Sequence, residues 1–155
     1  MTVTIGQPAP AFTVVTDEGK RSLADYKGKR LVLYFYPKDD TSGCTSEAHQ
    51  FRDECLRFTV NKAEILGVSK DSIASHEKFR AKHSLPFPLV ADTDGTLCEA
   101  FDVWKEKSMY GKKYMGIERS TFLIDENGVV VAIWRKVKVS SHIKEILNAL
   151  HELPA

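Results

Sequence analysis

A cysteine at position 44 follows a short polar loop that begins where an apolar segment ends. The apolar segment runs over Leu31–Tyr36, Pro37 closes it, and Cys44 lies where a helix is expected to begin. Backbone N–H groups in the first turn of a helix carry partial positive charge, which favours a thiolate over a thiol. A thiolate is a nucleophile at neutral pH, so the first hypothesis is cysteine redox chemistry.

The residues just before Cys44 indicate which kind of cysteine redox reaction to expect. A dithiol carrier with a Cys-x-x-Cys motif would have its other cysteine at position 41, where this chain has threonine. Without that cysteine, easy dithiol exchange is not possible. A hydroxyl there can instead donate a hydrogen bond to the thiolate, donate to an oxygen under attack, or cap the helix. Pro37 fixes one φ angle, and Gly43 lets the backbone come close to a ligand. This set suits attack of the Cys44 thiolate on a peroxide O–O bond, giving a sulfenic acid.

Two further cysteines, Cys55 and Cys98, each fall on an apolar helical stripe, where a free cysteine is commonly a small buried hydrophobe. Cys55 lies eleven residues after Cys44, about 16 Å along an intact helix at 1.5 Å per residue. A disulfide needs Cα atoms within roughly 7 Å, so Cys55 could pair with Cys44 only after extensive unwinding. The separation of Cys98 from Cys44 stays open at the level of sequence.

The composition excludes several other classes of function. The chain has 155 residues, one domain's length, with 43% hydrophobic and 28% charged residues. Its formal net charge is +1, from 22 basic and 21 acidic residues, so neither nucleic acid nor a membrane surface is an expected partner. The apolar runs are too short to span a bilayer, and the first residues lack a secretory pattern. Three cysteines do not suggest a disulfide scaffold, so we expect a single domain over 1–155 in the cytoplasm.

The elements that must position Cys44 follow from hydrophobic periodicity and turn residues. Strands or extended segments are expected at a short stretch ending at Val15, then at Lys20–Leu23, Leu31–Tyr36, Glu64–Val68, Pro86–Val90, Arg119–Ile124 and Val129–Trp134. Helices are expected at Ser42–Thr59, Ser72–His83, Asp94–Phe101 and Ser140–Leu150. The lysine-rich segment Lys105–Lys113 is expected to be a mobile loop near the active site. This order predicts a thioredoxin-like α/β sandwich with additional N-terminal strands and an inserted segment.

The motifs around Cys44 resemble those of a known family. Pro37-x-x-x-Thr41-x-x-Cys44 is similar to the signature of the peroxiredoxins. Gly43-Cys44-Thr45 with Glu47-Ala48, and later the segment Gly116–Asp125, resemble the Q-type branch, also called bacterioferritin comigratory proteins. The resemblance covers nearly the whole chain and implies an α/β, thioredoxin-like sandwich with peroxiredoxin N-terminal strands.

The resemblance implies a role for each matching residue. Cys44 would be the peroxidatic nucleophile, Thr41 would hold the peroxide and thiolate, and Pro37 would shield the site from water. Arg119 would stabilise the thiolate and the charge on the leaving oxygen, and a guanidinium suits this because it stays charged. Glu47, three residues after Cys44 on the same helix face, would orient Arg119. No cofactor and no metal are expected; the Asp92–Gly95 turn lacks the glutamate of a calcium loop.

The chain departs from the branch at the second, resolving cysteine. Q-type members place it either five residues after the first, where this chain has His49, or on the next helix near Arg80, and Ser72–His83 contains no cysteine. We therefore expect a one-cysteine cycle in which thioredoxin, glutaredoxin or a small thiol reduces the sulfenic acid. The alternatives are a two-cysteine cycle in which Cys98 resolves Cys44 after local unfolding, and a redox sensor or holdase. The resemblance further implies a monomer or weak dimer.

Overall fold

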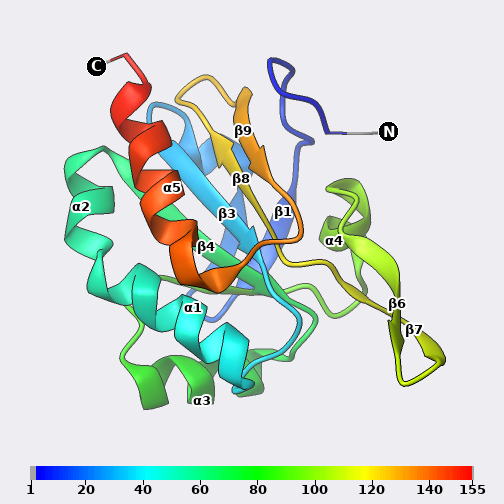
Figure 1. Ribbon diagram of the computed structural model, residues 1–155. Helices are drawn as coiled ribbons and strands as arrows, with labels where there is room; N and C mark the ends of the chain where they lie inside the picture. The colour runs from blue at the N-terminus through cyan, green and yellow to red at the C-terminus, as the bar shows by residue number, and fades with distance from the viewer. Residues whose placement is uncertain (1–2, 155) are drawn as a thin grey trace.

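The computed structural model describes residues 3–154, and a seven-stranded mixed sheet lies at its centre (Figure 1). The sheet order is β2-β1-β5-β4-β3-β8-β9, and β6 and β7 form a separate hairpin. The strands are β1 Thr13–Thr16, β2 Gly19–Ser22, β3 Arg30–Phe35, β4 Ala63–Ser69, β5 Leu89–Ala91, β6 Trp104–Met109, β7 Lys112–Ile117, β8 Ser120–Ile124 and β9 Val130–Trp134. The helices are α1 Ser42–Asp53, α2 Cys55–Val60, α3 Ile73–His83, α4 Thr96–Ala100 and α5 Val139–Glu152, with a 3₁₀ turn at Leu23–Tyr26. Within residues 3–154, no helix is long and apolar enough to cross a membrane.

Strand β3 separates two hydrophobic cores. It pairs in parallel with β4 and antiparallel with β8, and all six of its residues are buried. Because side chains alternate along a strand, Val32 and Tyr34 pack on one face with residues of α1, α3 and α5, while Leu31 and Leu33 pack on the other with α4. Cys44 belongs to the first core and Cys98 to the second, so the sheet lies between the two thiols.

The helix expected over Ser42–Thr59 is two helices, a difference from the sequence prediction. Glu54, with φ −103° and ψ 9°, ends α1 and precedes α2. The apolar periodicity correctly marks Phe51 and Phe58 as buried, and their ring centroids lie 5.6 Å apart. Periodicity reports which side chains are buried and does not report a local backbone bend. The separation of about 16 Å between Cys44 and Cys55 assumed one intact helix, and that assumption is wrong because α1 ends at Asp53.

The lysine-rich segment expected to be a loop is a β-hairpin, so that prediction is wrong. Strands β6 and β7 pair from Trp104↔Ile117 to Met109↔Lys112. The two turn residues, Tyr110 and Gly111, have φ angles of 53° and 80°, as tight hairpin turns require. The many lysines hid the strand pattern, because both faces of the outer part of the hairpin are exposed. The expected hairpin between β8 and β9 is confirmed, with Gly128 at φ 79°.

Candidate active site

Cys44 is the third residue of α1, and α1 begins beyond the carboxyl end of β3. Thr41 is extended, with φ −91° and ψ 155°, and its carbonyl oxygen accepts the Thr45 N–H at 2.8 Å to start the helix. The Cys44 side chain is 2% exposed and packs in the core with Tyr34 and Tyr36. The helix start thus places a thiol under the positive end of the helix dipole with only its edge open to solvent.

Arg119 links the thiol to a buried carboxylate. It lies between β7 and β8, and its Nη2 donates to Cys44 Sγ at 3.3 Å while its Nη1 donates to Glu47 Oε1 at 2.7 Å. The Val137 N–H donates to the Arg119 carbonyl oxygen at 3.0 Å and fixes this part of the backbone. The sequence-predicted residues Cys44, Glu47 and Arg119 therefore meet, although Arg119 is 75 positions from Cys44.

Gly43 makes room for the guanidinium. A Cβ built at this position would lie 3.2 Å from Arg119 Nη2, closer than nine in ten ordinary Cβ contacts. A side chain here would push Arg119 away from the thiol. The close approach anticipated for Gly43 is therefore to a catalytic-site side chain of the same chain.

Glu47 is a carboxyl group with no exposed surface. Burial raises its pKa to about 7, against the opposing charge and hydrogen bond of Arg119. Arg119 in turn has a raised pKa, because the charges of Glu47 and Cys44 outweigh its own burial. Among the described residues, Glu47 Oε2 and the Tyr34 hydroxyl are buried without a hydrogen-bond partner. The site therefore holds a carboxyl group that titrates near neutral pH, and Arg119 bridges this group and the Cys44 thiol.

The Thr41 hydroxyl is exposed and donates to the Lys38 carbonyl oxygen at 2.8 Å. It makes no capping hydrogen bond to α1. Its single hydrogen is thus used within the loop, and toward the site its oxygen can only accept. Pro37 is half-buried at the start of the same loop. Both residues precede Cys44 in the loop that leads into α1, and among the described residues neither has a hydrogen bond to Cys44.

Two residues that the sequence did not single out also belong to this region. Asp39 is buried inside the loop between Pro37 and Thr41, although its neighbours are exposed. Lys107, on β6, is half-buried, and burial followed by the nearby charge of Arg119 lowers its pKa. The proximity expected between the lysine-rich segment and the site thus comes from one lysine of the hairpin.

The other two thiols are placed differently from Cys44, and all three cysteines are free. Cys98 is buried, and burial followed by the nearby Asp92 raises its pKa far above the ordinary thiol value. Its backbone N–H also donates to Asp92 Oδ2 at 2.8 Å. Cys55 begins α2, is half-buried, and has a pKa raised by burial. Both thiols are therefore poorer nucleophiles at neutral pH than an ordinary cysteine.

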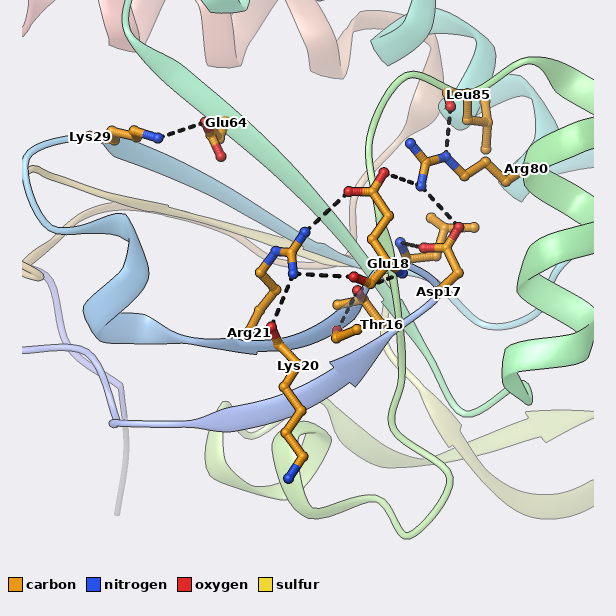
Figure 2. A network of polar contacts seen from close by, with 11 residues as sticks. Thr16, Asp17, Glu18, Lys20, Arg21, Lys29, Glu64, Arg80 and Leu85 are labelled. Atoms are coloured by element: carbon orange, nitrogen blue, oxygen red, sulfur yellow. Dashed lines mark hydrogen bonds and ion pairs between the residues drawn. The ribbon is translucent and has the colours of Figure 1, made fainter.

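The two positions at which the resemblance places a resolving cysteine are occupied by side chains that attach α3 to its surroundings. His49 Nε2 and His83 Nδ1 lie 2.8 Å apart and share a hydrogen bond between α1 and α3. Arg80 donates from Nε to the Leu85 carbonyl oxygen at 2.9 Å and from Nη1 to Asp17 Oδ2 at 3.0 Å, and it also pairs with Glu18. Figure 2 shows Arg80 reaching the turn between β1 and β2 in this way.

A thiol at a helix start, a guanidinium on its sulfur and a thioredoxin-like sheet behind it define the class of cysteine-dependent peroxidases. Comparison with known proteins agrees with this class. Residues 5–133 match the AhpC/TSA family. The chain is 54% identical over 154 residues to peroxiredoxin Bcp of Bacillus subtilis, covering 99% of this chain and 98% of that protein.

Solved structures give the same result. Peroxiredoxin Q of Xanthomonas campestris is 50% identical, with a TM-score of 0.86 over 90% of this chain and 89% of that one. A structure of the X. campestris bacterioferritin comigratory protein, described for its alkyl peroxide reduction activity, is 47% identical, with a TM-score of 0.89 over 96% of this chain and 98% of that one. The chain belongs to the AhpC/TSA family, as a peroxiredoxin of the Q-type, bacterioferritin comigratory branch. It is therefore a thiol-dependent peroxidase, and the fold and family expected from its sequence are confirmed.

Proposed function

We propose that Cys44 reduces hydrogen peroxide and organic hydroperoxides in a one-cysteine cycle. The observation that carries this proposal is the contact of Arg119 Nη2 with Cys44 Sγ at 3.3 Å. In the reaction the thiolate sulfur attacks one peroxide oxygen, the O–O bond breaks, and the leaving oxygen takes a proton to become water or an alcohol. The alkyl peroxide reduction described for the X. campestris protein supports including organic hydroperoxides.

The neighbouring residues have complementary roles in this proposal. Arg119 stabilises the thiolate before attack and the negative charge on the leaving oxygen during it, because a guanidinium offers several donors in a fixed plane. Glu47 holds that plane through the 2.7 Å hydrogen bond to Nη1. The Thr41 oxygen accepts a hydrogen bond from the peroxide O–H, since its own hydrogen is donated to Lys38. Pro37 and Gly43 shape the opening and exclude water.

The positions of the other cysteines support an external reductant. Cys98 packs on the opposite face of the sheet, so a bond to Cys44 would require one of them to leave its core. Cys55 follows the end of α1, and nine residues of that helix, roughly 14 Å, separate it from Cys44. An incoming thiol would condense with the sulfenic acid to give a mixed disulfide and water, and a second thiol would release Cys44. Thioredoxin, glutaredoxin and small thiols all fit this step.

Three serine variants test the proposal. We expect Cys44→Ser to abolish peroxide consumption and Cys55→Ser and Cys98→Ser to keep multiple turnover with a thiol reductant. Intact mass spectrometry after one equivalent of peroxide should show the wild-type chain with one added oxygen. A loss of two hydrogens that disappears in Cys98→Ser would instead establish Cys98 as the resolving cysteine. Fast oxidation of Cys44 without sustained turnover would favour a redox sensor or holdase.

We also propose a cytoplasmic location and a monomeric or weakly dimeric state for this protein. A thiol-dependent cycle and three free cysteines suit a reducing, cytoplasmic compartment. The monomer or weak dimer implied by the family stays a prediction, which light scattering on the purified protein would measure.

A further inference from the structure

Asp39 is anchored inward from the loop that precedes Cys44. It is 7% exposed, whereas Lys38, Asp40 and Thr41 are exposed. Its carboxylate accepts three side-chain hydrogen bonds, from the Tyr36 hydroxyl at 2.6 Å, Ser75 Oγ at 2.8 Å and His76 Nδ1 at 2.7 Å. Its own N–H donates to Asp71 Oδ2 at 2.8 Å. One loop residue is therefore attached both to α3 and to the segment that precedes it.

His76 lies wholly buried on α3 between two acceptors. Nδ1 faces Asp39 Oδ2 at 2.7 Å, and Nε2 faces the Val90 carbonyl oxygen at 2.8 Å. A carbonyl oxygen can only accept, so Nε2 carries a hydrogen, and donation to a carboxylate requires a second hydrogen on Nδ1. The ring is therefore an imidazolium. Burial alone would lower its pKa, but the hydrogen bond and charge of Asp39, together with Val90 and the charge of Asp71, raise it.

Asp39, Asp71 and His76 together also have the composition of a cation site, with ligand atoms within 4.8 Å of one another. Hydrogen-bond donors already occupy these atoms. Asp39 Oδ2 accepts from Ser75 and His76, and Asp71 Oδ2 accepts from Ser69 Oγ at 2.6 Å and from the Asp39 N–H. A metal would need a deprotonated Nδ1, whereas this nitrogen donates to Asp39. The arrangement fits a hydrogen-bonded ion pair.

The network reaches the active site through one peptide group. The Asp39 N–H and the Lys38 carbonyl belong to the same planar peptide. Asp71 accepts from the N–H side, and the Thr41 hydroxyl donates to the carbonyl side at 2.8 Å. Tilting this peptide would therefore turn the Thr41 hydroxyl, whose oxygen faces the peroxide in the proposed function.

We propose that Asp39 and His76 are a positioning pair that holds the Pro37–Thr41 loop in the geometry needed for peroxide attack by Cys44. The proposal rests on the proposed function of Cys44. Neither side chain touches the reacting atoms; they act through the Lys38–Asp39 peptide and Thr41. The pair does not generate the thiolate, so its loss affects peroxide reduction more than general reactivity of the thiol.

The charge state of His76 gives the pair a pH dependence of known sign. The charged and titratable groups facing His76 are Asp39, Asp71 and Tyr36. Its folded pKa is raised above the ordinary imidazole value, so both hydrogen bonds are present below that pKa and are lost as pH rises through it. Deprotonation removes one ring hydrogen and leaves either the buried Asp39 or Val90 without its donor. The rate of Cys44 oxidation should then fall on the alkaline side.

The experiment measures the second-order rate of Cys44 oxidation by hydrogen peroxide from pH 5 to pH 10. NMR of the His76 ring nitrogens locates its titration in the same protein. In wild type we expect the rate to fall on the alkaline side, with the same midpoint as the ring. In His76→Gln the neutral-pH rate should drop roughly 10- to 100-fold, as expected for a misplaced catalytic loop, and the alkaline fall should vanish. Alkylation of Cys44 by iodoacetamide should remain unchanged.

A second variant covers the case in which His76→Gln fails to fold. In Asp39→Asn the new amide can donate to a neutral Nδ1, so the network keeps its shape without its charge. The alkaline fall should be absent there as well. Leu150→Ala, in the same core at the far end of α5, is the matched control: it should lower stability by about 2–5 kcal/mol and keep the alkaline fall.

Different results would refute the positioning pair and the proposed function of Cys44. The positioning pair is refuted if the alkaline fall persists in both variants, if wild type shows none while the ring titrates, or if alkylation and peroxide rates fall together. A Cys44→Ser protein that still consumed peroxide would instead overturn the proposed function, whatever the behaviour of His76.

Discussion

Gly43→Ala tests whether the approach of Arg119 to Cys44 controls the rate of peroxide reduction. The added Cβ would lie 3.2 Å from Arg119 Nη2, which now lies 3.3 Å from Cys44 Sγ. Relaxation to an ordinary contact moves the guanidinium by a few tenths of an ångström and stretches the contact with sulfur to about 3.7 Å. The substitution therefore weakens one hydrogen bond and leaves the thiol, the carboxyl and the guanidinium in place.

The size of the effect follows from the strength of such a contact. Hydrogen bonds to charged groups contribute about 1.5–3 kcal/mol, so complete loss corresponds to roughly a 10- to 150-fold slower reaction. For a stretched contact we expect a loss of about 1 kcal/mol, or roughly fivefold. Alanine is the better helix former by up to about 1 kcal/mol, so the stability of Gly43→Ala should not fall. We therefore expect Gly43→Ala to reduce peroxide more slowly than wild type while its stability is unchanged or higher.

Stopped-flow oxidation of Cys44 and urea unfolding measure the two quantities. Ser42→Ala, one residue earlier on α1 and exposed, is the matched control and should oxidise at the wild-type rate. Arg119→Met gives the oxidation rate that corresponds to complete loss of the guanidinium. The reasoning is refuted if Gly43→Ala reacts as fast as wild type, or if its slower reaction is matched by an equal loss of stability.

Two further predictions concern stability. Because the folded pKa of Glu47 is about 7 and its ordinary value is 4.5, the folded state holds an extra proton between these values, and wild type should lose about 3 kcal/mol relative to Glu47→Gln as pH rises from 4 to 8. Parallel pH profiles in urea unfolding would contradict this. Arg80→Met removes the partner of Asp17, whose side chain is only 5% exposed, and should destabilise the fold by about 1–3 kcal/mol in thermal or urea unfolding. An unchanged midpoint would show that the Leu89 N–H, which donates to Asp17 Oδ1 at 2.9 Å, compensates for the lost charge.

The sequence is most informative where function depends on residue types at fixed spacing. Cys44 at a helix start, and Glu47 three residues later on the same face, follow from local geometry alone. The contact of Arg119 with Cys44 was predicted from the family resemblance, because no local rule connects two residues 75 positions apart. The inward orientation of Asp39 could not be predicted: Asp40 is an identical neighbour, and only the packing of α3 decides which carboxylate is buried. The bend at Glu54 could not be predicted either, because Phe51 and Phe58 on either side of it pack in the same core.

The side-chain contacts that attach α3 to its surroundings include Asp39–His76, His49–His83 and Arg80–Asp17. Two of them use His49 and Arg80, the positions where the family resemblance would place a resolving cysteine. A cycle that unfolded α1 or α3 to form an internal disulfide would have to break these contacts with no thiol there to gain. These contacts therefore support the proposed one-cysteine cycle, in which an external thiol reduces Cys44. Because only 2% of that residue is exposed, we expect a small thiol to reach the oxidised sulfur with less opening of α1 than a protein thiol needs.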